Sequence, residues 1–288
     1  MKTFEKAAVL TLALCLALSL AAAAAAATVT DAHGNEIELD ASLEAYTSVT
    51  LAGADGAARR GETNLGDLWT DALRWFAVSG AMNEFFEEDD VTAGNTRIDA
   101  DADHIVALWN GGNLRADVAE GKFGAEQLVE VLPYPNKVAV IYMTGAQLLE
   151  TLESASQGLP CTEDTAAACA SFMQASGLRY TVDTAREYDR GEAYGENWFR
   201  AASLSRVTIE EVNGRPFDAE DMYAVITSNA NFNGMDSSYM IKAAAEENEK
   251  STITTAAVRD AVWRYIEEEL KGEIGGDYAA EQGRITVR

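Results

Sequence analysis

Histidine is scarce in this sequence, in which His33 and His104 are the only two among 288 residues. A two-metal phosphoesterase needs several histidine, aspartate and asparagine ligands to hold both ions and the nucleophile between them. Two distant imidazoles do not supply that set, and with so few cysteines they do not complete a zinc site. We therefore predict that this chain holds no metal and no other cofactor.

Several catalytic and nucleotide-binding motifs are absent as well. The sequence contains no G-x-x-x-x-G-K-[ST], no G-x-G-x-x-G and no G-x-S-x-G. It therefore lacks the motifs of P-loop proteins, dinucleotide-binding domains and α/β serine hydrolases. A Ser-His-Asp triad also needs a histidine near its nucleophile, whereas His104 follows an acidic stretch. We therefore assign no catalytic residue.

Basic residues are few: Lys and Arg total 22 against 47 Asp and Glu, which gives a formal net charge of −25. Nucleic acids and anionic membranes are polyanions, and a protein of this charge repels both. We predict no nucleic-acid partner, and no membrane partner once the N-terminal segment described next is removed. A phosphate ligand would need arginines placed beside it to overcome the unfavourable overall field.

The apolar run at the N-terminus has the features of an export signal. Lys2 and Lys6 precede apolar residues 7–20, and alanines continue to Ala27. A short basic region, an apolar core and a small-residue exit are typical of a secretory signal peptide, and the core is short for a membrane span. We predict a signal peptide over 1–27 and a secreted or extracytoplasmic location, periplasmic or at the cell surface.

Removal of residues 1–27 would leave two cysteines, Cys161 and Cys169. An even count in an exported chain favours a disulfide, with two free thiols as the alternative. The disulfide would close a short loop and stabilise the fold modestly.

Apolar segments of strand and helix type alternate unevenly along the rest of the chain. Residues 28–54 are expected to form a hairpin around His33-Gly34-Asn35 and a linker, with small flexible residues at 52–58, and residues 55–288 to form the main domain. Capping and periodicity predict helices from Asn64, after Thr144 and over 255–271. Strands are expected over 105–109, 137–143, 177–183, 205–212, 222–227 and 285–287. This pattern indicates an α+β fold with a mixed β-sheet and flanking helices.

Residues 84–103 are rich in acidic side chains and are expected to form a solvated loop. Asp99, Asp101 and Asp103 also suggest a calcium site. The stretch lacks the glycine and the distal glutamate of a helix–loop–helix calcium loop, so the solvated loop is the favoured interpretation.

Five segments carry residue types that suit recognition, and they occur in a distinctive order. Residues 59–72 include Arg59, Glu62 and the run Leu-Gly-Asp-Leu, and Asn110-Gly-Gly-Asn-Leu-Arg115 follows. The others are Val-Leu-Pro-Tyr-Pro-Asn at 131–136, Thr-Gly at 144–145 with leucines behind it, and Phe-Met-Gln-Ala-Ser-Gly-Leu at 172–178. In this order they resemble motifs of the 5'-nucleotidase C-terminal domain family, where the first motif has Leu-Gly-Asn-Leu.

The resemblance covers residues 55–288 and implies a role in nucleoside recognition. In that family this domain binds the nucleoside part of a nucleotide, and a separate metallophosphoesterase domain cleaves the phosphate. Carried over, Arg59 and Arg115 would contact phosphate or carboxylate-like groups. Asn110 would hydrogen-bond the base or ribose, and Tyr134 would stack on the base.

One late motif departs from the family pattern Phe-Leu-Ala-x-Gly-Gly-Asp-Gly. When Asp236 is aligned with the family aspartate, Ala230 occupies the place of a second stacking Phe, and Met235 replaces a glycine. Phe232 lies two positions after Ala230, so its ring is the candidate to replace the second stacking Phe. The predicted binding residues are therefore Arg59, Asn110, Arg115, Tyr134, Phe232 and Asp236.

Three functional hypotheses remain. The first is an exported module that recognises a nucleoside or nucleotide and is not hydrolytic on its own. The second is a subunit of a split 5'-nucleotidase, completed by a separate metallophosphoesterase chain. The third is a structural or adhesion protein with a degenerate pocket, which the departures at Ala230 and Met235 favour.

Overall fold

The computed structural model describes residues 27–30, 34, 36–39, 43–87 and 97–288. Residues 1–26, which include most of the predicted signal peptide, and residues 88–96 of the acidic stretch lie outside this described part. Within it, no helix is long and apolar enough to cross a membrane.

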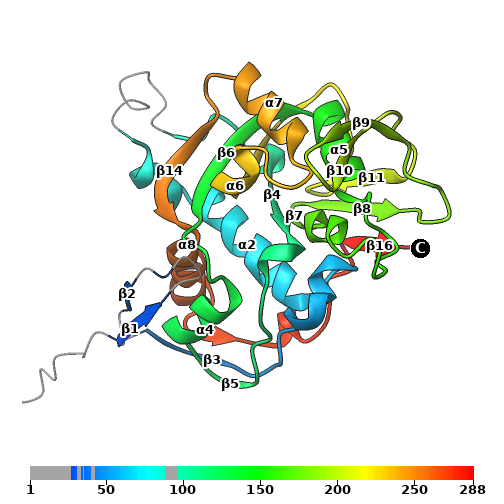
Figure 1. Cartoon of the computed structure of the whole chain (residues 1–288). Helices are drawn as coiled ribbons and strands as arrows, with labels where there is room; N and C mark the ends of the chain where they lie inside the picture. The colour runs from blue at the N-terminus through cyan, green and yellow to red at the C-terminus, as the bar shows by residue number, and fades with distance from the viewer. Residues whose placement is uncertain (1–26, 31–33, 35, 40–42, 88–96) are drawn as a thin grey trace, which may run out of the picture.

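A mixed five-stranded sheet forms the centre of the molecule (Figure 1). β4 and β13 pair in parallel, and the other neighbours are antiparallel. This arrangement, flanked by helices, confirms the predicted α+β class. In spatial order the strands are β14 (Thr252–Ala257), β6 (Lys137–Thr144), β13 (Met222–Ser228), β4 (Ile105–Asn110) and β7 (Met173–Ser176).

Four smaller sheets surround the central one. In spatial order, the first consists of β12 (Arg215–Pro216), β11 (Val207–Val212), β8 (Leu178–Val182) and β16 (Ile285–Val287), and the second of β15 (Glu273–Ile274), β3 (Glu44–Thr47) and β5 (Gly121–Gly124). The other two are hairpins, one of β1 (Ala27–Thr30) and β2 (Glu36–Leu39) and one of β9 (Arg190–Tyr194) and β10 (Trp198–Ala201). The antiparallel pairing of β1 with β2 agrees with the expected hairpin.

The central strands are continuously apolar because both of their faces are buried. In β4, Ile105, Ala107 and Trp109 enter one core cluster, while Val106 and Leu108 enter the other. The period of two in strand side chains produces this division. The first cluster includes side chains of α2 (Asn64–Val78) and α8 (Val258–Arg264), and the second those of α5 (Gly145–Ala155) and α7 (Tyr239–Glu247).

Sequence signals for two helix starts correspond to hydrogen bonds in the structure. The Thr63 hydroxyl accepts a hydrogen bond from the Gly66 amide at 3.1 Å and caps α2. Thr144 and Gln147 form the expected reciprocal capping box at the start of α5. Each cap satisfies amides that the first turn of a helix leaves unpaired.

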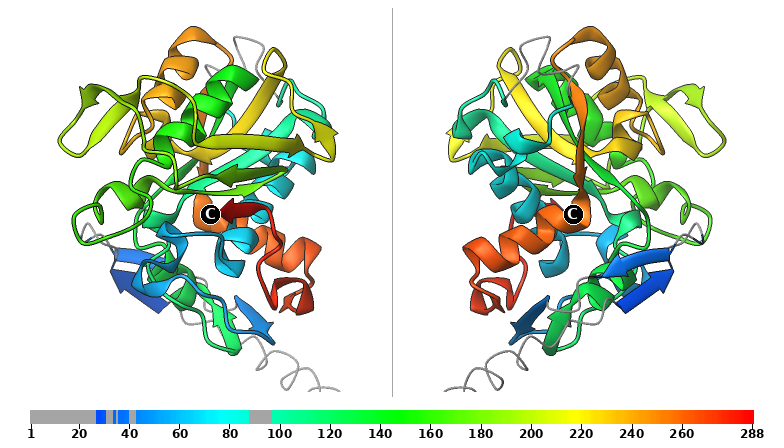
Figure 2. Two further views of the ribbon diagram at one scale, coloured as in Figure 1. Left: turned by 90° about the vertical axis from the view of Figure 1, so that its right-hand side faces the viewer. Right: turned by 90° about the vertical axis from the view of Figure 1, so that its left-hand side faces the viewer.

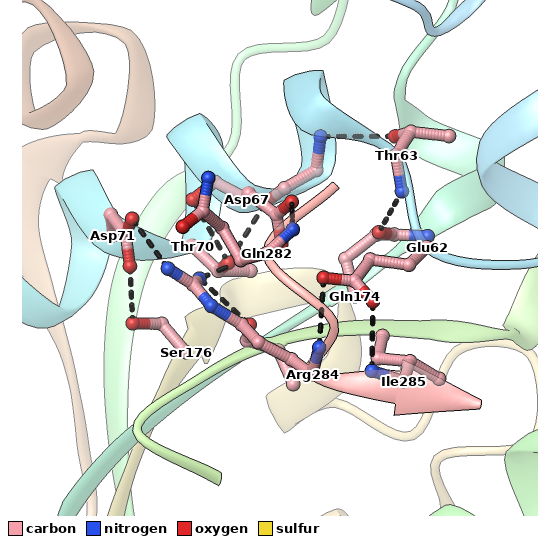
Figure 3. Close-up of polar contacts among 12 residues, drawn as sticks. Glu62, Thr63, Asp67, Thr70, Asp71, Gln174, Ser176, Gln282, Arg284 and Ile285 are labelled. Atoms are coloured by element: carbon pink, nitrogen blue, oxygen red, sulfur yellow. Dashed lines mark hydrogen bonds and ion pairs between the residues drawn. The ribbon is translucent and has the colours of Figure 1, made fainter. Parts of the chain in front are cut away.

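A buried polar network joins α2 to the segment around β16 (Figure 3). Arg284 donates to Asp71 at 2.8 Å and lies 3.6 Å from Asp67. The Glu62 carboxylate accepts hydrogen bonds from the backbone amides of Arg284 and Ile285 at 3.0 and 2.9 Å. Glu62 of the first sequence motif therefore has a structural role, because it fastens β16 to the start of α2.

The segment 28–54 was expected to precede the domain, and part of it belongs to the domain. β3 pairs with β5 and β15, so residues 44–47 form the middle strand of a sheet. The flexible linker predicted over 52–58 is wrong, because residues 54–59 form a 3₁₀-helix (Ala54–Arg59) and the Ala58 side chain is fully buried.

The helix predicted over 255–271 is too long at both ends. Residues 255–257 belong to β14, the α-helix covers Val258–Arg264, and a π-helical turn covers Tyr265–Glu269. Small residues such as Ala256 and Ala257 fit the helical period but also the pleated edge of a sheet, so periodicity alone did not separate the two.

The structure gives the three aspartates of the suggested calcium site different partners. Asp99 pairs with Lys250, Asp101 with His104 at 2.6 Å, and Asp103 with Arg215. Among the described residues, no group of three or more acidic, histidine or cysteine side chains is arranged to hold a metal ion.

Candidate functional site

A large cavity of about 710 Å³ opens where the parallel strands β4 and β13 end. Open α/β sheets place ligand sites outside the carboxyl ends of such strands. This volume lies within the range of about 300–1,000 Å³ that is usual for small-molecule sites. The lining residues are Asn110, Gly112, Asn113, Arg115, Tyr134, Pro135, Asn136, Ala170, Asn229, Ala230, Asn233, Gly234, Met235 and Asp236.

The turn after β4 brings backbone unusually close to neighbouring segments. A Cβ on Gly111 would lie 1.8 Å from the Ala58 carbonyl oxygen, and one on Gly112 would lie 2.7 Å from that of Ala170. Both positions therefore require glycine. This close packing fixes the direction in which Asn110 leaves the strand.

Asn110 is the centre of a hydrogen-bond chain at the cavity floor. Its amide nitrogen donates to the Asp236 carboxylate at 3.3 Å, and its amide oxygen accepts from the Asn113 side chain at 3.0 Å. Asn110 itself is 2% exposed, which holds its rotamer in place. The chain links the turn after β4 to the segment after β13.

Asp236 occupies a strained position beside this chain. Its φ of +55° lies in the left-handed region, which a residue other than glycine adopts only when its surroundings hold it there. Burial raises the pKa of its carboxyl, while Arg59 and the Asn110 hydrogen bond oppose that rise. Backbone strain of this kind is characteristic of binding and catalytic sites.

Arg115 and Tyr134 form the wall nearest to the turn. The Arg115 guanidinium lies 5.7 Å from the centre of the Tyr134 ring and donates to the Gly112 carbonyl at 2.9 Å. A cation over the ring face orients both groups. The Tyr134 ring and the half-exposed Met235 side chain are the large apolar groups in the lining.

A second, smaller cavity of about 300 Å³ shares Arg115 with the first. Arg59 and Arg60 also line it, with Gly53, Gly56, Leu114, Cys161 and Ala166. Among the residues that the structure describes, none of these three arginines forms an ion pair with a carboxylate. Burial and the neighbouring Arg115 lower the pKa of Arg59, as expected for crowded cations. Such a cluster suits an anionic group.

The disulfide pair lies next to this basic cavity. Cys161 and Cys169 are joined with their Cα atoms 5.9 Å apart. Cys161 lines the second cavity, and Ala170, which follows Cys169, lines the first. The short cross-linked loop is therefore part of the wall of the second cavity, and the residue that follows it lines the first.

The structure brings together most of the predicted binding residues, with one exception. Asn110, Arg115, Tyr134 and Asp236 line the large cavity, and Arg59 lines the adjoining one. Phe232 lines neither of them, because its ring packs against the second core cluster from α6 (Asn229–Phe232). We therefore leave Phe232 out of the proposed site. Sequence reasoning missed Asn136, Asn229 and Asn233, although an asparagine-rich run directly after a buried strand is a usable signal.

Comparison with known proteins then identifies the family. Residues 43–243 match the family pattern of the 5'-nucleotidase C-terminal domain. The chain belongs to the 5'-nucleotidase C-terminal domain family. Its match begins at residue 43, which agrees with the inclusion of β3 in the fold.

Two curated relatives share this domain. The chain is 30% identical over 203 residues to the trifunctional nucleotide phosphoesterase protein YfkN of Bacillus subtilis, covering 69% of this chain and 11% of YfkN. It is 28% identical over 183 residues to the cell wall protein Lmo0130 of Listeria monocytogenes, covering 61% of this chain and 18% of that protein. The chain thus spans less than a fifth of the length of either relative.

Solved structures of the same fold include a 5'-nucleotidase precursor and an NAD nucleotidase. A 5'-nucleotidase precursor from Thermus thermophilus superposes with a TM-score of 0.58 at 27% identity, over 84% of this chain and 39% of that one. The NAD nucleotidase of Haemophilus influenzae superposes with a TM-score of 0.58 at 13% identity, over 91% of this chain and 48% of that one, which supports the fold alone.

Proposed function

We propose that this chain is an exported recognition domain that binds a nucleoside or nucleotide in the large cavity and does not hydrolyse it alone. The observation that carries this proposal is the Asn110–Asp236 hydrogen-bond chain on the floor of a cavity of about 710 Å³. The family membership and the nucleotide phosphoesterase relative support the choice of ligand. The absence of hydrolysis is inferred from the two-histidine composition.

The chemistry of the lining suggests how such a ligand is held. Asparagine amides donate and accept, so they match the mixed hydrogen-bonding edges of ribose hydroxyls and a base. The Tyr134 ring offers a face on which a base can stack. Arg115 stands between the two cavities, so a phosphate attached to the ribose would reach Arg59 and Arg115 in the smaller one.

Binding of AMP and adenosine to the purified chain tests this proposal. Calorimetry should detect both ligands, and Arg115→Ala should weaken AMP binding about tenfold or more, because a charged hydrogen bond contributes about 1.5–3 kcal/mol. Adenosine, which lacks the phosphate, should lose much less. Arg186→Ala is the matched control, since Arg186 is an exposed arginine that pairs with Asp183 outside both cavities.

A parallel assay of phosphate release with added Mn²⁺ addresses catalysis. The proposal requires binding without turnover. Turnover by the chain alone would contradict that part of it, and failure of AMP and adenosine to bind would contradict the assignment of the cavity.

A split enzyme is the second candidate function. The chain covers less than half of the 5'-nucleotidase precursor and of the NAD nucleotidase with which it superposes, so a separately encoded metallophosphoesterase is the partner that would complete the site. Mixing the two chains and measuring phosphate release tests this candidate. The name of the cell wall relative supports an extracytoplasmic location for this chain, and fractionation of the source cells tests it.

A further inference from the structure

One wall of the large cavity is a short bent segment after β13. Six lining residues belong to it: Asn229, Ala230, Asn233, Gly234, Met235 and Asp236. The bend includes two left-handed residues, Gly234 with φ +83° and Asp236 with φ +55°. Backbone hydrogen bonds from Gly234 to Asn231 at 2.9 Å and from Met235 to Ala230 at 3.0 Å close the first part of the bend. The position of Asp236 beyond this turn also depends on contacts from other segments.

One of the contacts that reach this wall comes from the distant β9–β10 hairpin. The Tyr194 hydroxyl on β9 donates to the Gly234 carbonyl oxygen at 2.7 Å. A Cβ added to Gly234 would lie 2.3 Å from the same hydroxyl, so the Tyr194 side chain packs directly against the Gly234 backbone. Tyr194 does not itself line the cavity.

The hairpin is fastened to the body of the protein beside this contact. Figure 2 shows it projecting next to α7 in both views. The Tyr194 ring lies 5.6 Å from Tyr239, the first residue of α7, and the Arg200 guanidinium lies over both rings at 5.8 and 4.9 Å. Tyr239 accepts a hydrogen bond from the Ala201 amide at 2.9 Å. Aromatic and cation–π contacts of this kind fix a tyrosine ring in one place.

We propose that Tyr194 is a positioning residue for the large cavity, holding the bend so that Asp236 remains against Asn110. The choice of ligand in this inference rests on the proposed function. The hydrogen bond between Tyr194 and Gly234 does not depend on that choice. Without the hydroxyl, the Gly234 carbonyl loses its partner and the left-handed bend can relax. Ligand affinity then falls in proportion to the fraction of molecules that keep the binding conformation.

Tyr194→Phe tests the proposal, because it removes the hydroxyl and keeps the ring. Loss of one neutral hydrogen bond changes the equilibrium constant between the held and the relaxed bend by about fivefold, so we expect AMP and adenosine to bind more weakly by up to about fivefold. Tyr188→Phe is the matched control. The Tyr188 hydroxyl donates to the Phe199 carbonyl at 2.8 Å within the hairpin, so this variant makes the same chemical change away from the wall.

Hydrogen exchange of the amides at 229–238 provides a second measurement that needs no ligand. We expect faster exchange there in Tyr194→Phe and wild-type rates in Tyr188→Phe. Equal affinity and exchange in wild type and Tyr194→Phe would overturn the proposal, as would equal losses in both variants. If wild type binds neither ligand, the proposed function fails, and the exchange rates alone still decide whether Tyr194 holds the bend.

Discussion

Asp67 is a fully buried carboxyl near the start of α2, and its side chain is 1% exposed. Burial raises its pKa to about 8, Arg284 opposes the rise, and the neighbouring Glu62 carboxylate adds to it. Asp71, on the next turn, also faces Arg284, so two carboxyl groups share one guanidinium, while Glu62 accepts from the Arg284 backbone amide. At neutral pH Asp67 therefore holds a proton and resembles the asparagine that stands in this place in the family motif.

This proton makes stability depend on pH. In the unfolded chain the pKa of Asp67 is close to 3.8, the ordinary value for an aspartate, whereas in the folded state it is about 8. The folded state binds the extra proton between these values, so its contribution to stability is present at low pH and is lost as the pH rises toward 8.

Asp67→Asn should remove this dependence of stability on pH, because the asparagine side chain does not titrate and its amide donates a hydrogen bond at every pH in this range. We expect similar stabilities near pH 4 and an advantage for the variant that grows as the pH rises, reaching on the order of 5 kcal/mol at pH 9. Urea unfolding across this range measures the difference, and Asp117→Asn serves as a control carboxyl that accepts backbone amides near the surface. A constant difference between wild type and Asp67→Asn at all pH values would show that Asp67 is ionised throughout.

At the scale of elements, the turn after β4 is the most tightly constrained junction near the site. A methyl group on Gly111 would overlap the Ala58 carbonyl, whereas one on Gly61 would meet open space. We expect Gly111→Ala to lower the free energy of unfolding by about 1–3 kcal/mol and Gly61→Ala to change it by less than about 0.5 kcal/mol. Chemical denaturation of both variants measures this, and equal stability of the two would mean that the turn adapts.

Elements with strong local signals were predictable from the sequence. β4, β6 and β13 have long apolar runs because both faces are buried, apolar periodicity predicted α2, and a capping box predicted α5. The helix at 255–271 was overextended, because residues in β14 satisfy either period. β9 and β10 were not predicted, since their exposed residues carry no burial pattern.

The candidate site was predictable where it coincides with family motifs at strand ends, as for Asn110, Arg115 and Tyr134. Asn229 and Asn233 were missed because asparagine is common in ordinary turns. Phe232 was included because of its nearness in sequence, but the direction of its ring depends on how α6 packs. Tyr194 could not be predicted, since the contact joins residues forty positions apart.

At the scale of the whole molecule, the excess of acidic side chains opposes compaction. With a formal net charge of −25, raising NaCl from about 20 to 300 mM at pH 7 should raise the melting temperature by a few degrees, because salt screens the repulsion. The sequence isoelectric point is ≈ 4.3, so the same salt step near that pH should have little effect. An unchanged melting temperature at pH 7 would mean that local ion pairs already balance the repulsion.

The parallel pairing of β4 with β13 joins two neighbouring strands that are synthesised at different times. Ile105 lies beside Ala224 in the finished sheet, so β4 leaves the ribosome well before the partner that covers its edge. At about 5–20 residues per second, the delay is on the order of ten seconds. During that time a strand that is apolar from Ile105 to Trp109 has no native neighbour on that side. Until β13 has been made, keeping the nascent chain away from other apolar surfaces would limit its aggregation.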